Sequence, residues 1–226
     1  TTNLDTVAKM SCNPAIGGIA KGHIVREIDA LGGEMAKVTD CTSIQSRMLN
    51  RSKGPSVWAP RAQTDRISYQ FEMKSRLENC PNLFMRQGTA ERLLVENQQI
   101  TGIETKEGIR YLGKTVILSA GTFMRGLLHM GDQQFSGGRA GDSAAMGISA
   151  SLKEHDFLLG RLKTGTPPRI HMRSIDKTLI EEQKGEDGVY FSYEKPTSPR
   201  KAQVSCFITY TNEETHAIVR KHLHRS

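Results

Sequence analysis

Apolar residues recur at helical spacing near the start of the chain, in the stretch "SCNPAIGGIAKGHIVREIDALGG". Spacings of three and four residues predict one buried helix face, formed by Ile16, Ile19, Ala20, Ile24, Ile28 and Leu31. Asn13 followed by Pro14 is a typical helix start, and the pair Gly32 and Gly33 is a typical stop. We therefore expect a helix that begins just after Cys12.

Three glycines, Gly17, Gly18 and Gly22, lie in the first turns of this expected helix. Each glycine costs a helix roughly 1 kcal/mol relative to alanine, so the sequence predicts that something approaches this backbone closely. Two interpretations stay open at this point. Either a ligand uses the glycine face, or the helix packs on a neighbouring strand.

The rest of the pattern alternates between helices and short strands. A helix is expected over about 62–77, followed from residue 83 by a β-meander with turns at 97–98 and 106–108. The meander leads into an apolar strand, 116–119, which ends on Ala120 and Gly121. Three further segments follow: a helix in "SAAMGISASLKEH", and strands in "DFLLGRLKTGTPPR" and "SCFITYT". The polar stretch between the last two is expected to be irregular, and a final helix to begin at Thr211 or Asn212.

The composition is that of an ordinary globular chain of one or two domains. It has 226 residues, of which 37% are hydrophobic and 24% charged. No apolar run approaches the roughly 20 residues that span a bilayer, and no signal peptide opens the chain, so we expect no membrane and a cytoplasmic location. The four cysteines have neither disulfide-framework nor zinc-site spacing, so no metal is expected.

The net charge is +7, which suits a polyanionic partner. The positive side chains form two groups, one with Arg47, Arg51, Lys53, Arg61 and Arg66, and one with Arg161, Lys163, Arg169 and Arg173. Each group could instead be ordinary solvated surface. Trp58, within the first group, would either stack on a base or belong to the core.

The block Ile100–Thr122 resembles the FAD-linked flavoproteins with two dinucleotide-binding domains, in which an apolar strand ending in Ala-Gly or Thr-Gly lies against the flavin nucleotide. Further motifs narrow this resemblance: "SCNPAIGGIAKGH", "RSKGPSVWAPRAQTDR", "SAGTF", "FSGGRAGD", "GRLKTGTPPR" and "CFITYTNEETH". These motifs, in this order along the chain, resemble those of the tRNA uridine 5-carboxymethylaminomethyl modification enzymes, the MnmG (GidA) family. The resemblance covers essentially the whole chain.

The resemblance implies an α/β fold: part of a Rossmann-like FAD/NAD(P)-binding domain with a β-meander and an inserted α/β domain. It implies approximate domains of 1–170 and 171–226. We expect an internal piece of a longer protein, because the resemblance places the GxGxxG phosphate loop upstream of Thr1, and the NAD segment and helical domain downstream of residue 226. Such a piece should be inactive alone.

The family's activity would be addition of a carboxymethylaminomethyl group to C5 of the wobble uridine of certain tRNAs. The implied cofactors are FAD, NADH and methylene-tetrahydrofolate, and the implied partners are tRNA, the GTPase MnmE and a second copy in a homodimer. Two alternatives are kept: a folate- and FAD-dependent tRNA uridine-5-methyltransferase, and a non-catalytic RNA- or nucleotide-binding module.

Five residues are candidate site residues. Cys12 is the catalytic candidate, because a thiol at a helix N-terminus tends toward thiolate and because the family's Cys-Asn-Pro cysteine matters for function. The resemblance implies FAD contacts at Ala90 and Ala145. Relatives carry serine at the latter, so only backbone or van der Waals contact would remain there. Gly121 would approach the cofactor through its backbone, and Arg139 is expected to face flavin or substrate.

Overall fold

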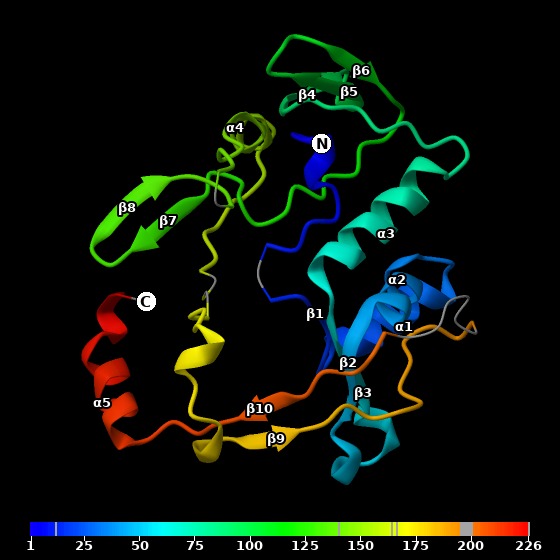
Figure 1. Ribbon diagram of the computed structural model, residues 1–226. Helices are drawn as coiled ribbons and strands as arrows, with labels where there is room; N and C mark the ends of the chain where they lie inside the picture. Colours follow the sequence, from blue (N-terminus) through cyan, green and yellow to red (C-terminus); the bar gives the residue numbers. More distant parts are fainter. Residues whose placement is uncertain (12, 140, 164, 166, 195–200, 226) are drawn as a thin grey trace. The chain divides into compact units, whose positions relative to one another are not determined.

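The computed structural model (Figure 1) describes residues 1–226 except 12, 140, 164, 166, 195–200 and 226. The chain divides into two units by its contacts, and each is described by itself. Unit 1 comprises Thr1–Val7 and Pro81–Leu162, and unit 2 comprises Ala8–Cys80 and Lys163–Ser226. The domain boundary near residue 170 that the resemblance implies stays a prediction.

Unit 2 is built on a three-stranded antiparallel sheet in the order β1-β3-β2. The strands are β1 Ala15–Gly17, β2 Ser43–Leu49 and β3 Ala59–Thr64. Ala62 in the middle strand pairs with Ile16 on one side and with Ser46 on the other. The central strand therefore has partners along both edges, which explains why this polar-looking segment is buried.

The helices α1 Lys21–Ala30 and α2 Met35–Thr42 pack against this sheet, and α3 Arg66–Glu78 packs against α2. The core they enclose consists of Val25, Ala36, Ala62 and Phe191, with Ile16 and Met35 packed against it. Phe191 comes from the polar stretch that was expected to be irregular, and only 2% of its surface is exposed. This stretch therefore contributes a core residue.

The remainder of unit 2 contains the antiparallel pair β9 Glu181–Gln183 and β10 Cys206–Ile208, followed by α5 Glu213–Lys221. The chain beside this pair also covers the outer edge of β2, since Glu186 donates its N–H to the Ser46 carbonyl and Val204 donates to Ile44. Asn212 caps α5 by accepting from the N–H of Thr215 at 2.9 Å, which confirms the predicted start.

Unit 1 contains the meander β4 Ala90–Glu96, β5 Gln99–Thr105 and β6 Arg110–Leu112, in that order. Both predicted turns are confirmed. The first has positive φ at Asn97 and Gln98, and the second has positive φ at Gly108. A hairpin, β7 Leu127–Met130 and β8 Gln133–Ser136, and the helix α4 Gly147–Glu154 follow.

Short 3-10 turns of the described residues, in both units, lie at Leu4–Thr6, Arg51–Lys53, Pro55–Val57, Met172–Ser174, Lys177–Leu179 and Leu223–Arg225.

The helix predicted to begin just after Cys12 is wrong at its start. Residues Ala15–Gly17 form β1, and α1 begins only at Lys21. Gly17, Gly18 and Ala20 have φ values of 79°, 98° and 62°, which an α-helix excludes. The Pro14 carbonyl accepts from Thr64, so pairing with β3 replaces the local helix.

The buried face of α1 also differs from the predicted one. Its buried residues are Gly22, Val25 and Asp29, whereas Ile24 and Leu31 are 54% and 89% exposed. The helix therefore packs with its glycine face inward.

Four other predicted elements are wrong among the described residues, one helix at its start and three strands. The helix expected over 62–77 starts at Arg66 instead, because 59–64 is the central strand of the sheet. No strand forms over 83–88, 116–119 or the described part of 156–169. Ile117 is 91% exposed, and an apolar strand needs neighbouring strands to pair with and bury against.

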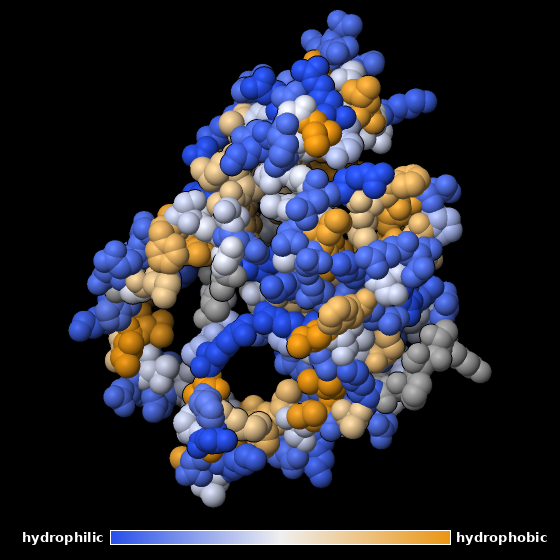
Figure 2. Space-filling view, turned by 45° about the horizontal axis from the view of Figure 1, so that its top comes forward, coloured by the Kyte–Doolittle hydropathy of each residue, from blue (hydrophilic) through white to orange (hydrophobic). Residues whose placement is uncertain are grey.

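Apolar side chains also lie at the surface, scattered among hydrophilic ones in the view of Figure 2. The most exposed are Leu31, Ile117, Leu158 and Leu162. Within the described residues, no helix is long and apolar enough to cross a membrane.

Candidate functional site

The loop that follows the predicted apolar strand is held by two backbone hydrogen bonds. Ala145 donates its N–H to the Phe123 carbonyl at 3.2 Å, and its own carbonyl accepts from Arg125 at 2.8 Å. Met124 and Ala145 form an isolated parallel bridge. Because both backbone groups of Ala145 are bonded within the chain, the contact left to a ligand is mainly van der Waals contact with its methyl group.

Gly121 is exposed, and its backbone is open. Its φ is 69°, a left-handed value that favours glycine. A Cβ added to Gly121 would meet no atom within 4 Å, so no neighbour in the described chain requires a glycine there. The backbone conformation alone explains this residue type, and it leaves the peptide accessible to a ligand.

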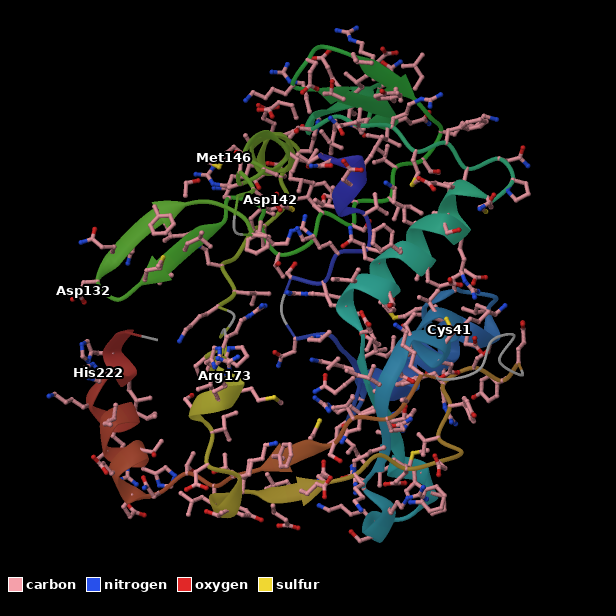
Figure 3. All side chains as sticks on the ribbon, viewed as in Figure 1. Cys41, Asp132, Asp142, Met146, Arg173 and His222 are labelled. Carbon is pink, nitrogen blue, oxygen red and sulfur yellow. The ribbon has the colours of Figure 1, made fainter. Side chains whose placement is uncertain are left out.

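Arg139 is paired within its own loop. Its Nε lies 2.7 Å from Asp142 Oδ2, and the backbone of the same two residues is joined by an Asp142 N–H to Arg139 carbonyl bond of 2.7 Å. Figure 3 shows Asp142 and Met146 beside α4, on the segment that leads to it. The guanidinium is therefore fixed by a carboxylate, and a role toward flavin or substrate stays a prediction.

Ala90 is the first residue of β4 and pairs with Thr105. The residue after it, Glu91, reaches the start of α4, where a Cβ on Gly147 would fall 2.0 Å from the Glu91 carboxylate. Ala90 is therefore one residue away from the contact between Glu91 and Gly147, and Ala145 is two residues away from it. The structure places Ala90, Gly121, Arg139 and Ala145 all in unit 1.

Cys12 lies outside the described residues. Its neighbours Ser11 and Asn13 belong to unit 2. The helix that was expected to lower the pKa of this thiol begins at Lys21, so that electrostatic reason for a reactive Cys12 is withdrawn. The role implied by the resemblance stays a prediction.

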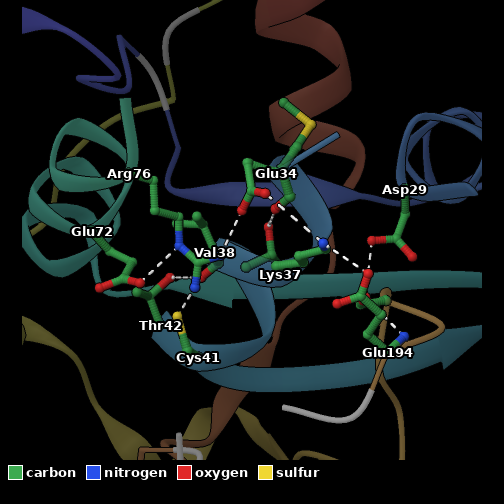
Figure 4. Close-up of polar contacts among 12 residues, drawn as sticks. Asp29, Glu34, Lys37, Val38, Cys41, Thr42, Glu72, Arg76 and Glu194 are labelled. Carbon is green, nitrogen blue, oxygen red and sulfur yellow. Dashed lines mark hydrogen bonds and ion pairs between the residues drawn. The ribbon is translucent and has the colours of Figure 1, made fainter. Parts of the chain in front are cut away.

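Cys41 lies on α2 and is half-buried. Figure 4 shows Cys41 next to the ion pairs of Arg76 with Glu34 and Glu72. Burial raises the pKa of the Cys41 thiol, and its Sγ donates to the Val38 carbonyl at 3.3 Å. A thiol with a raised pKa is a poor nucleophile at neutral pH, which does not favour a catalytic role for Cys41.

The first basic group is largely bonded. Arg51 pairs with Glu186 at 2.6 Å and stands over the Trp58 ring at 5.6 Å. Arg47 donates to the Lys184 carbonyl at 2.7 Å. Trp58 is 36% exposed and donates its Nε1–H to the Arg51 carbonyl, so it is neither a core residue nor free to stack on a base through both faces.

Sequence reasoning did not identify Asp29 and Asp40, two carboxylates that are 7% and 3% exposed. They accept from three consecutive backbone N–H groups, those of Phe191, Ser192 and Tyr193. The sequence contained one signal for Asp29: it shares the helical spacing of Gly22 and Val25 and so lies on the same helix face. A buried acidic residue on that face requires donors.

No described group of three His, Cys, Asp or Glu side chains is arranged to hold a metal ion. An open depression of about 790 Å³ lies on the meander, and none of the four described candidate residues lines it. Its lining residues are Gln99, Ile100, Thr101, Leu112, Gly113 and Lys114.

Comparison with known proteins identifies relatives over the whole chain. It is 63% identical over 226 residues to the tRNA uridine 5-carboxymethylaminomethyl modification enzyme MnmG of Protochlamydia amoebophila, and 60% identical over 227 residues to that of Chlamydia felis. All of this chain is covered in both cases, but only 36% and 37% of the two relatives. The chain therefore spans a little over a third of their length.

Solved structures agree. Aquifex aeolicus GidA, in two crystal forms, matches with a TM-score of 0.90 in each, at 45% and 46% identity, over 99% and 100% of this chain and 38% of that protein. This likeness confirms the predicted α/β fold class. The model of the family described as glucose inhibited division protein A matches residues 1–226. The chain therefore belongs to the glucose inhibited division protein A (GidA) family.

Proposed function

We propose that this chain is part of an FAD-dependent enzyme that takes part in adding the carboxymethylaminomethyl group to C5 of the wobble uridine of certain tRNAs. The observation that supports this most is the 63% identity to the Protochlamydia amoebophila MnmG along the whole chain. Since the chain spans 36% of that relative, the activity, substrate and partners of the complete protein all belong to this proposal.

The flavin would supply the redox chemistry when bound. The residues of unit 1 fit such a group, because Gly121 has an open backbone in a conformation that favours glycine. Ala90 would add backbone contact and Ala145 van der Waals contact, from two segments that meet at Glu91 and Gly147. Arg139 would act from a fixed position, because Asp142 holds its guanidinium.

On the family resemblance, Cys12 is proposed as a functional thiol. The family resemblance points to a second cysteine, in a downstream Arg-Tyr-Cys-Pro motif, as the group that would add to the uracil ring. Cys12 would then serve the same reaction in a supporting redox or nucleophilic step. The remaining proposed components are NADH as reductant, methylene-tetrahydrofolate as one-carbon donor, the GTPase MnmE, a homodimer and a cytoplasmic location.

The experiment that tests this proposal is flavin binding, followed by flavin absorbance and fluorescence. The isolated chain is compared with the full-length gene product that carries this sequence. We expect binding by the full-length product and none by the isolated chain, because the resemblance places the phosphate loop upstream of Thr1. A full-length product that binds no flavin would refute the flavoenzyme proposal.

Gly121 offers a site-directed test with a matched control. Gly121→Ala and Gly108→Ala place the same methyl group at φ values of 69° and 80°, and in both cases no atom lies within 4 Å. Each should cost about 1 to 2 kcal/mol of stability through the left-handed backbone. Only Gly121→Ala should also weaken flavin binding, whereas equal affinities for the two variants would exclude Gly121 from the site.

A further inference from the structure

The helix α4 is attached to the meander by a hydrogen bond from a strand edge. β4 is the first strand in the order β4-β5-β6, so one of its edges has no strand partner. On β4, the Leu93 N–H donates to Ser151 Oγ at 3.0 Å. Ser151 is 2% exposed and Leu93 is half-buried, so this bond gives the buried Ser151 hydroxyl a partner.

A second contact lies about one turn earlier on the same helix. The Glu91 carboxylate occupies the space beside Gly147, where a Cβ would fall 2.0 Å from its Cδ and Oε1 atoms. Gly147 is the first residue of α4, and Met146 before it provides no side-chain cap. A carboxylate at this end of a helix is stabilised by the free N–H groups and the helix dipole.

These two contacts fix how α4 lies on β4, and with it the segment that precedes α4. Ala90 is adjacent to Glu91, and Ala145 is two residues before Gly147. The backbone of Ala145 is hydrogen-bonded to Phe123 and Arg125, so a shift of Ala145 would also shift the loop that follows Gly121. The two contacts between β4 and α4 therefore set the spacing of the segments that carry Ala90, Ala145 and Gly121.

We propose that Ser151 and Glu91 are positioning residues for flavin binding: they hold α4 on β4 and thereby set the distance between the backbone at Ala90 and the backbone at Ala145. This inference rests on the proposed function, since it takes these two segments as flavin contacts. Neither side chain is assigned a contact with the flavin itself. Their effect is on where the contacting segments lie.

The test uses Ser151→Ala in the full-length gene product, with Ser149→Ala as the matched control. Ser149 lies on the same helix and is also 2% exposed, but the Leu93 N–H bonds to Ser151 instead. We expect Ser151→Ala to raise the Kd for FAD about tenfold, because the segments that carry Ala90 and Ala145 lose their fixed spacing. Ser149→Ala should change the Kd less than about twofold at a similar loss of thermal stability.

Glu91→Gln is the second variant, in case Ser151→Ala does not fold. It keeps the size of the side chain and removes its charge, and it should raise the Kd about threefold and alter the circular dichroism of the bound flavin. Wild-type protein that binds FAD, with Ser151→Ala and Glu91→Gln binding equally well, would overturn this inference and leave the proposed function standing. Wild-type protein that binds no FAD would overturn both.

Discussion

Gly17 packs closely against two other segments of unit 2. A Cβ at this position would lie 2.3 Å from the Pro60 carbonyl oxygen and 2.5 Å from Cζ of Phe191. A Cβ on Gly22, the second residue of α1, would meet the same neighbour, at 2.6 Å from the Pro60 oxygen. Both glycines are therefore needed for packing of the chain against itself.

Gly17→Ala should destabilise the protein more than Gly32→Ala. The two glycines have similar φ values, 79° and 88°, but a Cβ on Gly32 would meet no atom within 4 Å. Gly32→Ala should lose about 1 to 2 kcal/mol through the backbone alone. Gly17→Ala adds an overpacking cost of about 1 to 3 kcal/mol. Urea denaturation of the full-length product measures both, and equal losses would show that the contacts with Pro60 and Phe191 relax freely.

The glycine pattern illustrates what a sequence can specify at the scale of single residues. It predicted a close approach, and it left open whether a ligand or the chain itself makes that approach. The structure supports packing, with β3 and Phe191 as the partners of Gly17. Phe191 could not be found by periodicity, because it lies far along the chain in a polar stretch. Arg139 and Asp142, by contrast, are three residues apart, and their pairing is a local event.

At the scale of elements, α3 shows how a helix start is encoded. Asp65 is its N-cap and accepts from the N–H groups of Ile67 and Ser68 at 3.1 and 3.0 Å. Lys201 places its Nζ 2.9 Å from Asp65 Oδ2. The bond from the Ser68 backbone, followed by the bond from Lys201, lowers the pKa of Asp65 from 3.8 to about 2. The ionised carboxylate therefore stabilises the folded state.

Asp65→Asn should lower stability at pH 7 and have less effect as the pH falls. The folded pKa is depressed, so the stabilisation is fully present above about pH 4 and is lost as the pH falls toward 2. The Asp65 side chain is 37% exposed, so solvent screening reduces the expected difference to about 1 kcal/mol.

Denaturation of wild-type protein and Asp65→Asn between pH 3 and pH 7 measures this difference. Lys201→Met should remove only part of the pH dependence, because it leaves the Ser68 bond in place. A difference between wild type and Asp65→Asn that is constant with pH would contradict this account.

Elements with local signals were predicted well, and those that depend on distant partners were not. The cap at Asn212, the turn at Asn97 and Gln98 and the core of α4 are all specified by neighbouring residues. The segment Ala15–Gly17 reads as a helix because its apolar spacing is helical, yet it pairs with β3, whose partnership lies outside any local window. Long-range strand pairing overrides local helix propensity in such cases.

At the scale of the whole molecule, unit 2 is closed by contacts between residues far apart in sequence. Asp40 on α2 accepts from the N–H groups of Phe191 at 2.9 Å and Ser192 at 2.8 Å, and Asp29 on α1 accepts from Tyr193 at 2.8 Å. These bonds hold Phe191 in the core. The two acidic residues therefore join the start of the chain to a segment near its end.

Asp40→Asn should loosen this closure without unfolding the unit. The amide that replaces the carboxylate keeps one acceptor oxygen, and the charge-assisted bonds it loses are worth about 1.5 to 3 kcal/mol. Hydrogen exchange at the Phe191 and Ser192 amides should accelerate at least about tenfold, and exchange at Tyr193 should change less because Asp29 is intact.

The control is Asp187→Asn, which changes an exposed carboxylate on the same segment and should leave all three exchange rates unchanged. If Phe191 and Ser192 exchange at wild-type rates in Asp40→Asn, the core position of Phe191 is maintained by packing alone, and the carboxylate of Asp40 is not what closes unit 2.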